Sequence, residues 1–413
     1  MPRSLLRHRD FQLLAGSVGL SALGDWLALT PIVLFLQEST GSGLVVAALF
    51  IAFWSPAIVF AGVAGLLVDR FETRRLLAAI SLVQAVIALA LAFTGSTAGI
   101  LILATLLGVG FALAQPAEFA LVPVVAGEQR LSDANGYVET ARYTGFTIGP
   151  LLGGVLAATG GMKVALLVNA ATFIAVAVAA TLIRARREPV ARAAGEKDRA
   201  RDGVVFLFRD RLLALVMAVA FASLTFMTAS ATAEVFFAKD VLDAGDVGFG
   251  ALITSWTLMM AIGSLVVARH FRMALAAGAL TAIVVQSAGL ALPTLWLFFP
   301  FALASFGLGG LAHGLKNVLI RTLIHERVPD RLHGRAYAAY NGLRNGAELI
   351  AMASGGVLVV AIGARWTLFL AGAIPALAGL AGLAAYTRFR ERDVEAAPAL
   401  APEPELAVAP PLD

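Results

Sequence analysis

Arg75-Leu-Leu-Ala-Ala-Ile-Ser-Leu-Val-Gln-Ala-Val-Ile-Ala-Leu-Ala-Leu-Ala-Phe-Thr94 is the stretch that decides the class of fold. After its first residue it carries no charge, and a helix of this length spans the roughly 30 Å hydrocarbon core of a bilayer. There, every backbone polar group must be paired within the protein. Similar runs recur along almost the whole chain, and period-two alternation is absent, which excludes an outer-membrane barrel.

The composition supports the same class of protein. The 413 residues are 59% hydrophobic and only 14% charged, with a mean hydropathy of +0.85. Soluble domains carry about a quarter of charged residues, so this chain cannot cover a water-facing surface. The absence of cysteine excludes disulfides, thiol nucleophiles and thiolate metal sites. The five histidines lack the two-histidine spacing that binds zinc on a helix, so we expect no metal or cofactor.

The apolar runs predict an all-α membrane protein with twelve transmembrane helices in two pseudo-symmetric six-helix bundles. The first six helices are expected at residues 12–36, 43–67, 75–94, 98–120, 135–158 and 163–183. The second six are expected at residues 212–236, 248–268, 273–292, 294–317, 336–361 and 366–387. The expected domains are an N-terminal bundle at 1–183, a cytoplasmic linker at 184–211, a C-terminal bundle at 212–388 and a disordered cytoplasmic tail at 389–413.

The loops between these helices alternate sharply in charge. Twenty-five basic residues fall on one side of the predicted membrane, and three, namely Lys163, Lys239 and Arg365, fall on the other. The positive-inside rule therefore predicts an inner (plasma) membrane protein with both termini in the cytoplasm. This asymmetry also explains the pI near 9.7 without a nucleic-acid partner.

An internal repeat supports the division into halves. Gly153-Gly-Val-Leu-Ala-Ala-Thr-Gly-Gly-Met-Lys matches Gly355-Gly-Val-Leu-Val-Val-Ala-Ile-Gly-Ala-Arg at a constant offset of 202. The match keeps the glycine pair, a third glycine and the loop cation, and in the same register Arg142 falls on Arg344. Two six-helix halves in the same orientation are what a transporter with a midplane site between parallel repeats requires.

A charged motif follows the second predicted helix, Gly65-Leu-Leu-Val-Asp-Arg-Phe-Glu-Thr-Arg-Arg. Gly65 lets the helix end approach its neighbour closely, and Asp69 can face the positive N-terminus of a facing helix. Arg70 and Arg74 can pair with acids around the loop between the fourth and fifth helices, among them Glu118. The alternative is that the arginines of this motif only fix the topology, and this is our interpretation for Arg75.

The fifth predicted helix carries a series of small residues at regular spacing, namely Gly136, Gly145, Gly149, Pro150, Gly153 and Gly154. Three of these glycines repeat every four residues and therefore form a smooth face, on which helices pack closely in lipid, and the proline adds a kink. Ordinary small-residue packing is the alternative interpretation.

Together these patterns resemble the major facilitator superfamily. The loop motif is similar to that family's signature between its second and third helices, and the glycine series is similar to the antiporter motif of its exporters. With Gly24-Asp25-Trp26 and Val328-Pro-Asp-Arg-Leu-His-Gly-Arg335, the chain resembles the branch of macrolide-efflux pumps and the enterobactin exporter over residues 9–388. The resemblance implies export, and a latch on the cytoplasmic side formed by Gly65, Asp69, Arg70, Arg74 and Glu118.

One departure from the family is that the helix at residues 98–120 has no arginine. The best-known drug/proton antiporters carry one in that helix, so the resemblance does not imply their proton route.

Charged residues inside the spans are candidates for proton coupling, because a charge at mid-bilayer costs about 2.5–3.5 kcal/mol. Asp25 lies near the middle of its helix and is our first candidate. The others form two pairs, three and four residues apart, so that each pair shares a helix face; they are Glu139 with Arg142 and Arg344 with Glu348. Self-neutralised pairs that only lower the cost of insertion are the alternative. Glu118 and Glu234 are expected at the membrane interface.

Large aromatic and methionine side chains are candidates for a deformable substrate cavity. They are Trp26, Trp54, Phe226, Met227, Trp256 and Tyr340. Taken alone, each of them is better explained by packing against lipid or neighbouring helices.

The sequence therefore predicts a secondary active transporter, and not an enzyme, that exports small amphipathic or hydrophobic compounds, such as drugs, macrolides or siderophores, in exchange for protons. We expect alternating access in a monomer that contacts its substrate, protons and membrane lipid. A lipid or lysolipid flippase on the same fold is the first alternative. A membrane receptor or scaffold without transport is the second, although the linker and tail offer no folded sensory domain.

Overall fold

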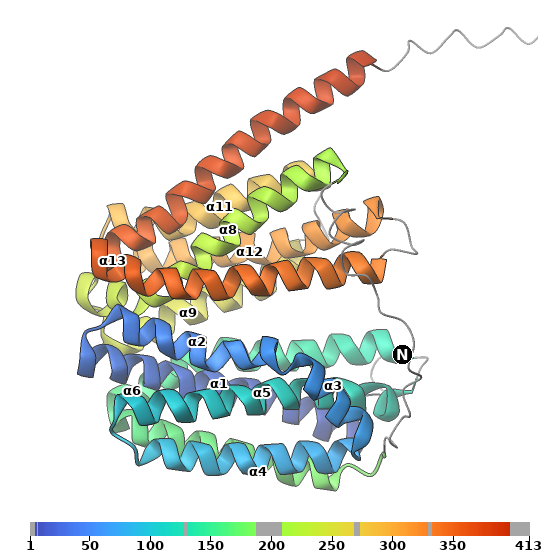
Figure 1. Cartoon of the computed structure of the whole chain (residues 1–413), viewed down its shortest axis with the longest axis vertical. Helices are drawn as coiled ribbons and strands as arrows, with labels where there is room; N and C mark the ends of the chain where they lie inside the picture. The colour runs from blue at the N-terminus through green and yellow to red at the C-terminus, as the bar shows by residue number, and fades with distance from the viewer. Residues whose placement is uncertain are drawn as a thin grey trace, which may run out of the picture.

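The computed structural model describes residues 5, 7–127, 130–186, 209–267, 273–328 and 333–396, and its regular elements there are all helical. The first group is α1 (Arg9–Thr40), α2 (Gly43–Val59), α3 (Ala61–Arg70), α4 (Thr73–Ala92), α5 (Thr97–Ala126) and α6 (Leu131–Leu182). The second is α8 (Arg211–Phe236), η3 (Phe237–Val241), α9 (Gly245–Ile262), η4 (Gly263–Val267), α11 (Leu275–Leu295), α12 (Phe299–Arg327) and α13 (His333–Ala396). Figure 1 shows the two groups as two stacked bundles.

Two of these helices turn back on themselves. α6 has 52 residues and α13 has 64, about twice the length that crosses a bilayer. The φ angle is +71° at Gly161 in α6 and +80° at Gly363 in α13, in the left-handed region that favours glycine. These two are the third glycines of the sequence repeat, so equivalent residues separate the last two helical arms of each half. Figure 1 shows the two arms of α13 meeting at an acute angle.

The expected set of spans follows from this division. Among the described residues, eight helices are long and apolar enough to cross a membrane, and α6 and α13 are two of them. Each of these two supplies two arms, and α12 and the α2–α3 pair complete the twelve segments expected from the sequence. The surface of the helices is rich in exposed apolar side chains, such as Val86 and Ile350, which a bilayer can solvate.

The helix ends differ from the prediction in two places. The helix expected at 43–67 is divided at Phe60, where φ is −96° and ψ is 5°, one turn after Pro56. The last helix continues to Ala396, past the start of the predicted tail at 389, because residues such as glutamate, arginine and alanine favour a helix. Most of the predicted linker (187–208) and the rest of the tail (397–413) lie outside the described residues.

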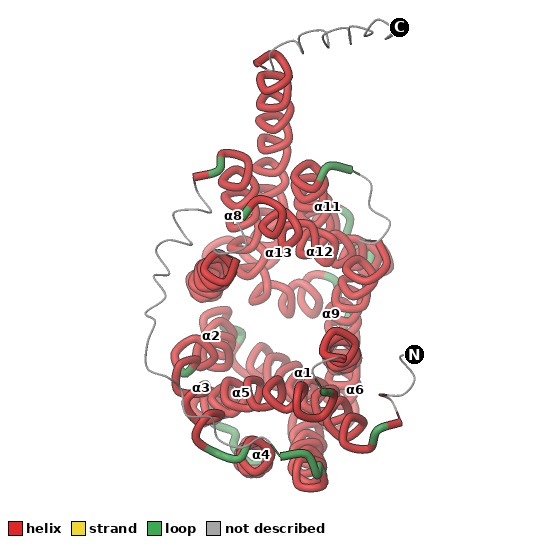
Figure 2. Tube along the Cα trace, turned by 90° about the vertical axis from the view of Figure 1, so that its right-hand side faces the viewer, coloured by secondary structure: helices red, strands yellow, loops and turns green. Residues whose placement is uncertain are grey.

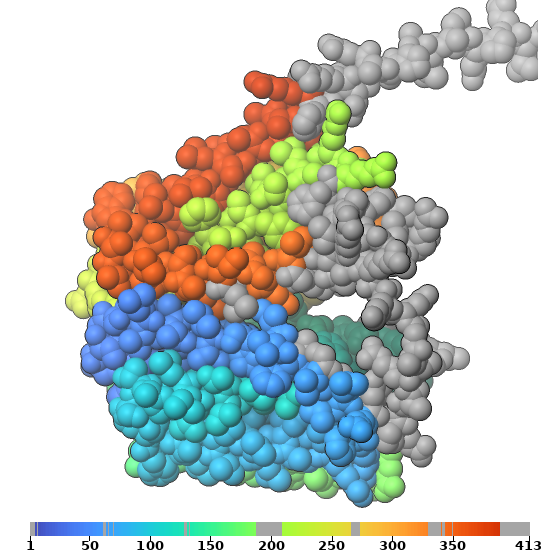
Figure 3. Space-filling view, viewed as in Figure 1, coloured from blue at the N-terminus to red at the C-terminus, as the bar shows by residue number. Residues whose placement is uncertain are grey.

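Among the described residues, the apolar packing that joins the two halves lies at one end of the molecule. We call this the closed end; α1 and α8 run toward it, and they begin at the opposite, open end. One apolar cluster joins both halves at the closed end and includes Leu36, Phe50 and Phe249. At the open end each half has a cluster of its own, one around Leu14 and one around Leu319. Figure 3 shows the halves in contact at the left and a hollow between them at the right, and Figure 2 looks onto that right-hand side.

Equivalent glycines make two of the contacts between the halves. A Cβ atom on Gly154 of α6 would lie 2.6 Å from the carbonyl oxygen of Asp246 in α9. A Cβ atom on Gly356 of α13 would lie 2.8 Å from the carbonyl oxygen of Gly43 in α2. Because no side chain fits at either crossing, both helix pairs approach backbone to backbone.

Polar side chains join the same end. The Gln37 amide donates to the Asp240 carboxylate at 2.9 Å, which links α1 to η3. The Lys239 ammonium lies 2.8 Å from Asp246 in its own half and 3.9 Å from Glu38 in the other. Apolar packing, backbone contacts and ion pairs therefore all close the same end of the molecule.

Candidate functional site

A buried ion-pair cluster lies within the first half. Arg142 of α6 is 3.2 Å from the Glu118 carboxylate of α5 and 3.6 Å from Glu139, one turn earlier in its own helix. Its guanidinium also stacks over the ring of Phe119, 4.9 Å from the centroid. Glu118 is 2% exposed and Arg142 is 6% exposed, so water does not screen their attraction.

Asp25 on α1 lies in the same electrostatic neighbourhood. Its side chain is buried, and the charges that act on it most are those of Glu118 and Arg142. Within the described part of the chain it forms no ion pair of its own. The preceding Gly24 sets its position, because a Cβ atom there would lie 2.5 Å from polar atoms of Asn169 and Thr172 in the second arm of α6.

The position of Glu118 corrects the sequence interpretation. It was expected at the interface, paired with Arg70 or Arg74, and it instead lies inside the bundle and pairs with Arg142. The reason is that α5 continues two turns past Glu118, to Ala126, so this carboxylate faces α6 within the span. The predicted pairing of Glu139 with Arg142 is confirmed.

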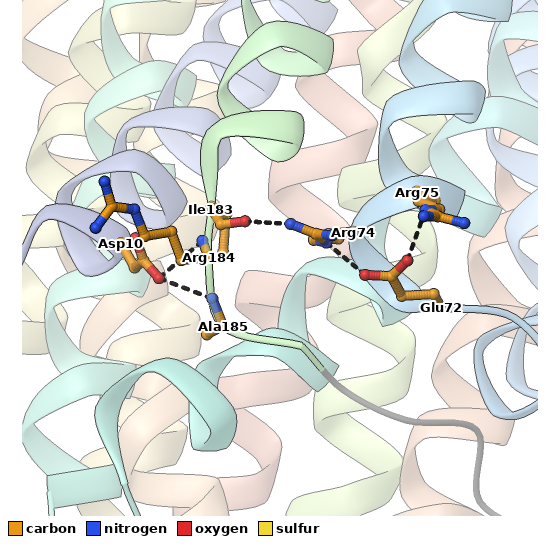
Figure 4. A network of polar contacts seen from close by, with 7 residues as sticks. All are labelled: Asp10, Glu72, Arg74, Arg75, Ile183, Arg184 and Ala185. Carbon is orange, nitrogen blue, oxygen red and sulfur yellow. Dashed lines mark hydrogen bonds and ion pairs between the residues drawn. The ribbon is translucent and has the colours of Figure 1, made fainter.

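The charged loop motif has a different set of contacts (Figure 4). Arg74 pairs with Glu72 and also donates to the backbone carbonyl of Ile183 at 2.7 Å, at the C-terminal end of α6. The Arg74 hydrogen bond, supported by the charges of Arg74 and Arg75, lowers the pKa of Glu72. The side chains of Gly65 and Asp69 lie outside the described set, and Arg70 is exposed at the end of α3. Arg74 is thus a cation at a helix C-terminus, where it offsets the helix dipole.

Asp10 holds the other side of the same chain segment. Its carboxylate accepts hydrogen bonds from the backbone N–H groups of Arg184 and Ala185, at 2.9 and 2.8 Å. Figure 4 shows that Asp10 and Arg74 approach this segment from opposite sides. The point at which the chain leaves the first half is therefore fixed to both α1 and α4.

The three glycines spaced four residues apart in α6 pack closely on a neighbouring helix, as their spacing predicts, and the structure identifies that helix as α1. Gly145 contacts the carbonyl oxygen of Gly19. A Cβ atom on Gly149 would lie 2.7 Å from the Cβ atom of Trp26, and a Cβ atom on Gly153 would lie 3.0 Å from the Cβ atom of Thr30. The remaining members of the series differ. Gly154 contacts α9, and Pro150 contacts Gly250, which also belongs to α9. A Cβ atom on Gly136 would have open space around it to a distance of 4 Å.

A pocket of about 220 Å³ opens within the second half. Among the predicted cavity residues, Met227 and Tyr340 line it, together with Arg344 and Glu348, which form the expected pair at 3.1 Å. Tyr143 of α6 also lines it, so both halves contribute to its wall.

The other predicted cavity residues lie elsewhere. The ring of Trp256 is 5.8 Å from that of His313, next to the pocket, whereas Trp26 packs on Gly149. Trp54 belongs to an aromatic group with Phe53 and Phe111, and Phe226 is half-buried on α8. The six residues therefore do not form a single cavity.

Three polar residues at this pocket were missed by the sequence interpretation. Lys316 and His313 of α12 line it, and Gln286 of α11 contacts His313. The signal that could have found them is a histidine and a lysine three residues apart inside an apolar run. Among the described residues, no group of three or more His, Cys, Asp or Glu side chains is placed to hold a metal ion.

Comparison with known proteins assigns the chain to a family. Residues 14–351 match the model of the Major Facilitator Superfamily. An uncharacterised MFS-type transporter of Bacillus subtilis (strain 168), YfiS, is 25% identical over 406 residues, covering 92% of this chain and 94% of that protein.

Solved structures share the fold. The nucleoside transporter NupG superposes with a TM-score of 0.71 at 14% identity, covering 92% of this chain and 99% of that one. The POT family transporter PepTSo superposes with a TM-score of 0.69 at 13% identity, covering 93% and 99%. Because the family model matches most of its length, the chain belongs to the Major Facilitator Superfamily and is a membrane-spanning secondary transporter, not an enzyme.

Proposed function

We propose that the protein exports small amphipathic compounds from the cell in exchange for protons. The observation that carries this proposal is the acidic cluster of the first half. Glu118 and Glu139 lie 3.2 and 3.6 Å from Arg142, and the charges of Glu118 and Arg142 also act on a third carboxylate, the buried Asp25. One cation cannot neutralise three carboxylates, and an unpaired carboxylate is costly inside a membrane, so a proton is the natural counter-ion.

Alternating access is supported by the uneven contact between the halves. The closed end is held by backbone contacts at Gly154 and Gly356 and by the bond between Gln37 and Asp240. The open end carries the arginine-rich loops that the positive-inside rule assigns to the cytoplasm. This structure then corresponds to an inward-facing state, which can take up a substrate from the cytoplasm.

The direction of transport and the substrate class follow from two further features. The glycine series of α6 resembles the antiporter motif of exporters, and three of its glycines pack on α1, the helix that carries Asp25. Protonation of Asp25 can therefore act on the same helix contact. The wall of the pocket combines Phe221, Met227 and Met260 with charged groups, which suits a compound with both an apolar and a polar part.

The test is transport into inverted membrane vesicles, with a panel of a macrolide, a catecholate siderophore and a lysolipid. We expect accumulation of at least one compound that stops when an uncoupler collapses the proton gradient. Asp25→Asn should lose this gradient-driven accumulation and keep its fold and its substrate binding.

The matched control is Asp243→Asn, which makes the same chemical change at an exposed position. Asp243 has a φ of +52°, a conformation that asparagine also tolerates. This variant should transport like the wild type. Undiminished accumulation by Asp25→Asn would remove Asp25 from the mechanism, and accumulation that persists with the uncoupler would refute proton coupling.

A lysolipid flippase is the second candidate, and one feature favours it. An open groove of about 510 Å³ runs between α1 and α6, and Leu20, Leu23 and Ile148 are among its mostly apolar lining residues. Such a surface fits an acyl chain better than a polar solute. Translocation of a labelled lysolipid in proteoliposomes, without competition from the macrolide or the catecholate, would favour this activity over drug export.

A further inference from the structure

A chain of polar side chains crosses the second half. The Lys316 ammonium lies 3.3 Å from Nδ1 of His313, and the same ring nitrogen lies 3.1 Å from the amide oxygen of Gln286. The Gln286 amide nitrogen in turn lies 3.4 Å from the Ser223 hydroxyl. α8, α11 and α12 therefore meet at a continuous polar path that neither the loop motif nor the acidic cluster uses.

Lys316 stands out in this path because it is a buried basic side chain. Its side chain is 3% exposed, and the described residues place no carboxylate within ion-pair distance of its ammonium. An ammonium has three N–H donors, and the one polar atom that the described residues place against this one is Nδ1 of His313, which can accept from it only in the tautomer that carries its proton on Nε2. A buried cation without a counter-charge is costly in a membrane, and such residues mark substrate or ion pathways.

The pocket gives this charge an accessible face. Lys316, His313 and Arg344 all line the space of about 220 Å³, and Tyr143 of the other half lines it as well. Arg344 lies 3.1 Å from Glu348 and is 39% exposed, so its guanidinium has donors left for a second acceptor. The wall of the pocket thus offers two cationic donors against one carboxylate.

We propose that this pocket binds the anionic group of the transported compound, a carboxylate or a phosphate, through Lys316 and Arg344. The bound anion supplies the missing counter-charge of Lys316 and shares Arg344 with Glu348. The apolar part of the compound lies against Phe221, Met227 and Tyr340 on the same wall. This assignment rests on the proposed transport function for the identity of the ligand, and it narrows the substrate class to organic anions.

The test is binding to the full chain in nanodiscs, measured by titration calorimetry with three probes that share one ring system. The probes are naphthoate, naphthyl phosphate and the neutral naphthamide, which separate a carboxylate, a phosphate and an uncharged amide. We expect the wild type to bind at least one anion about tenfold or more tightly than the amide, as a charge-assisted hydrogen bond implies. Equal affinity for the anions and the amide would overturn the proposal.

Substitutions at Lys316 test whether this residue causes the preference for anions over the neutral amide. Lys316→Gln should lose the preference for the anions, and Lys316→Arg should retain it, which shows that the loss reflects charge and not misfolding. Lys163→Gln is the matched control, because Lys163 is exposed and stacks over Phe93 at 4.5 Å; it should bind like the wild type. Retention of the preference in Lys316→Gln, or its loss in Lys163→Gln, would refute the assignment.

The binding measurement tests the anion site independently of proton coupling. Loss of anion selectivity in Lys316→Gln, with uncoupler-sensitive transport of a neutral compound intact, would support the anion site and leave the proposed exporter in place. Transport that continues after the uncoupler collapses the proton gradient, with anion-selective binding intact, would refute proton coupling and still support the anion site.

Discussion

Single buried charges set the energetics of the first half. Arg142 is the one cation that the described residues place against Glu118, and Glu118 is 2% exposed. Arg142→Gln should therefore destabilise the protein by about 3–5 kcal/mol, because it leaves a buried carboxylate without its partner. Adding Glu118→Gln should recover most of that loss. Thermal unfolding in detergent, followed by the fluorescence of the five tryptophans, measures both effects.

The control for this pair is Arg75→Gln. Arg75 pairs with Glu72 at 2.7 Å but is 78% exposed, so its loss should change the stability by less than about 1 kcal/mol. If the Arg142 variant is as stable as the wild type, or the double variant is no more stable than the single one, Arg142 does not neutralise Glu118.

Asp210 gives a pH-dependent prediction at the open end of the second half. Burial raises the pKa of this carboxyl, but hydrogen bonds from the Leu213 backbone N–H and from Arg327 outweigh it, and the net shift is downward. A lowered pKa stabilises the fold above the unfolded value, near 3.8, and this stabilisation is lost as the pH falls through the folded value. Asp210→Ala should therefore cost about 1 kcal/mol of helix capping at neutral pH, together with the ion pair.

The measurement is the melting temperature between pH 7 and pH 3. The difference between the wild type and Asp210→Ala should shrink once the pH passes below the unfolded value. Asp210→Asn keeps the capping oxygen and loses the charge, so its melting temperature at pH 7 should lie between those of the wild type and Asp210→Ala. A difference that stays constant over this range would show that the ionised carboxylate contributes nothing.

Sequence spacing predicts contacts within a helix and not those between helices. Glu139 with Arg142 and Arg344 with Glu348 are three and four residues apart, and both pairs form as the helical period requires. Glu118 and Arg142 are 24 residues apart, and their contact depends on how α5 faces α6. The link from His313 to Gln286 depends in the same way on α12 and α11. For this reason the buried position of Glu118 and the polar path of the second half were missed.

At the scale of helices, the glycines of α6 set its distance from α1. Gly145 touches the backbone of Gly19, and a Cβ atom there would also lie 2.6 Å from the backbone nitrogen of Leu23. Gly145→Ala should separate the two helices, lower the melting temperature and reduce transport. Gly136 belongs to the same series but has open space around it, so Gly136→Ala should be neutral or stabilise α6 by up to about 1 kcal/mol.

The two variants separate close packing from sequence pattern. Both are measured by thermal unfolding and by transport in inverted vesicles. Equal effects of the two substitutions would contradict a role for backbone contact, because the motif spacing contains both glycines and only one of them meets α1.

The helical elements themselves were largely predictable from the sequence. Apolar runs located the spans, and the repeat aligned Gly161 with Gly363, where the structure breaks both long helices. The division of the second span at Phe60 and the continuation of α13 to Ala396 were not predictable, since hydropathy does not register a local change of φ and ψ.

At the scale of the whole molecule, the repeat places equivalent glycines at the two crossings between the halves. Gly154 meets α9 and Gly356 meets α2, and both crossings lie in the part of the molecule where one apolar cluster spans the halves. At the open end, by contrast, each half keeps a cluster of its own. Opening the closed end would therefore separate the apolar cluster and the glycine crossings that join the halves as well as its polar links, whereas the clusters of the open end each lie within one half.

Cross-linking the closed end tests this movement. The chain has no cysteine, so Gln37→Cys with Asp240→Cys introduces the only two thiols, at positions joined by a 2.9 Å hydrogen bond between the halves. A short cleavable thiol cross-linker should bring transport to background while ligand binding from the open end persists, and cleavage of the linker should restore transport. Gln37→Cys alone, treated with the same reagent, should stay active. Full transport by the completely cross-linked protein would show that the closed end does not open during the cycle.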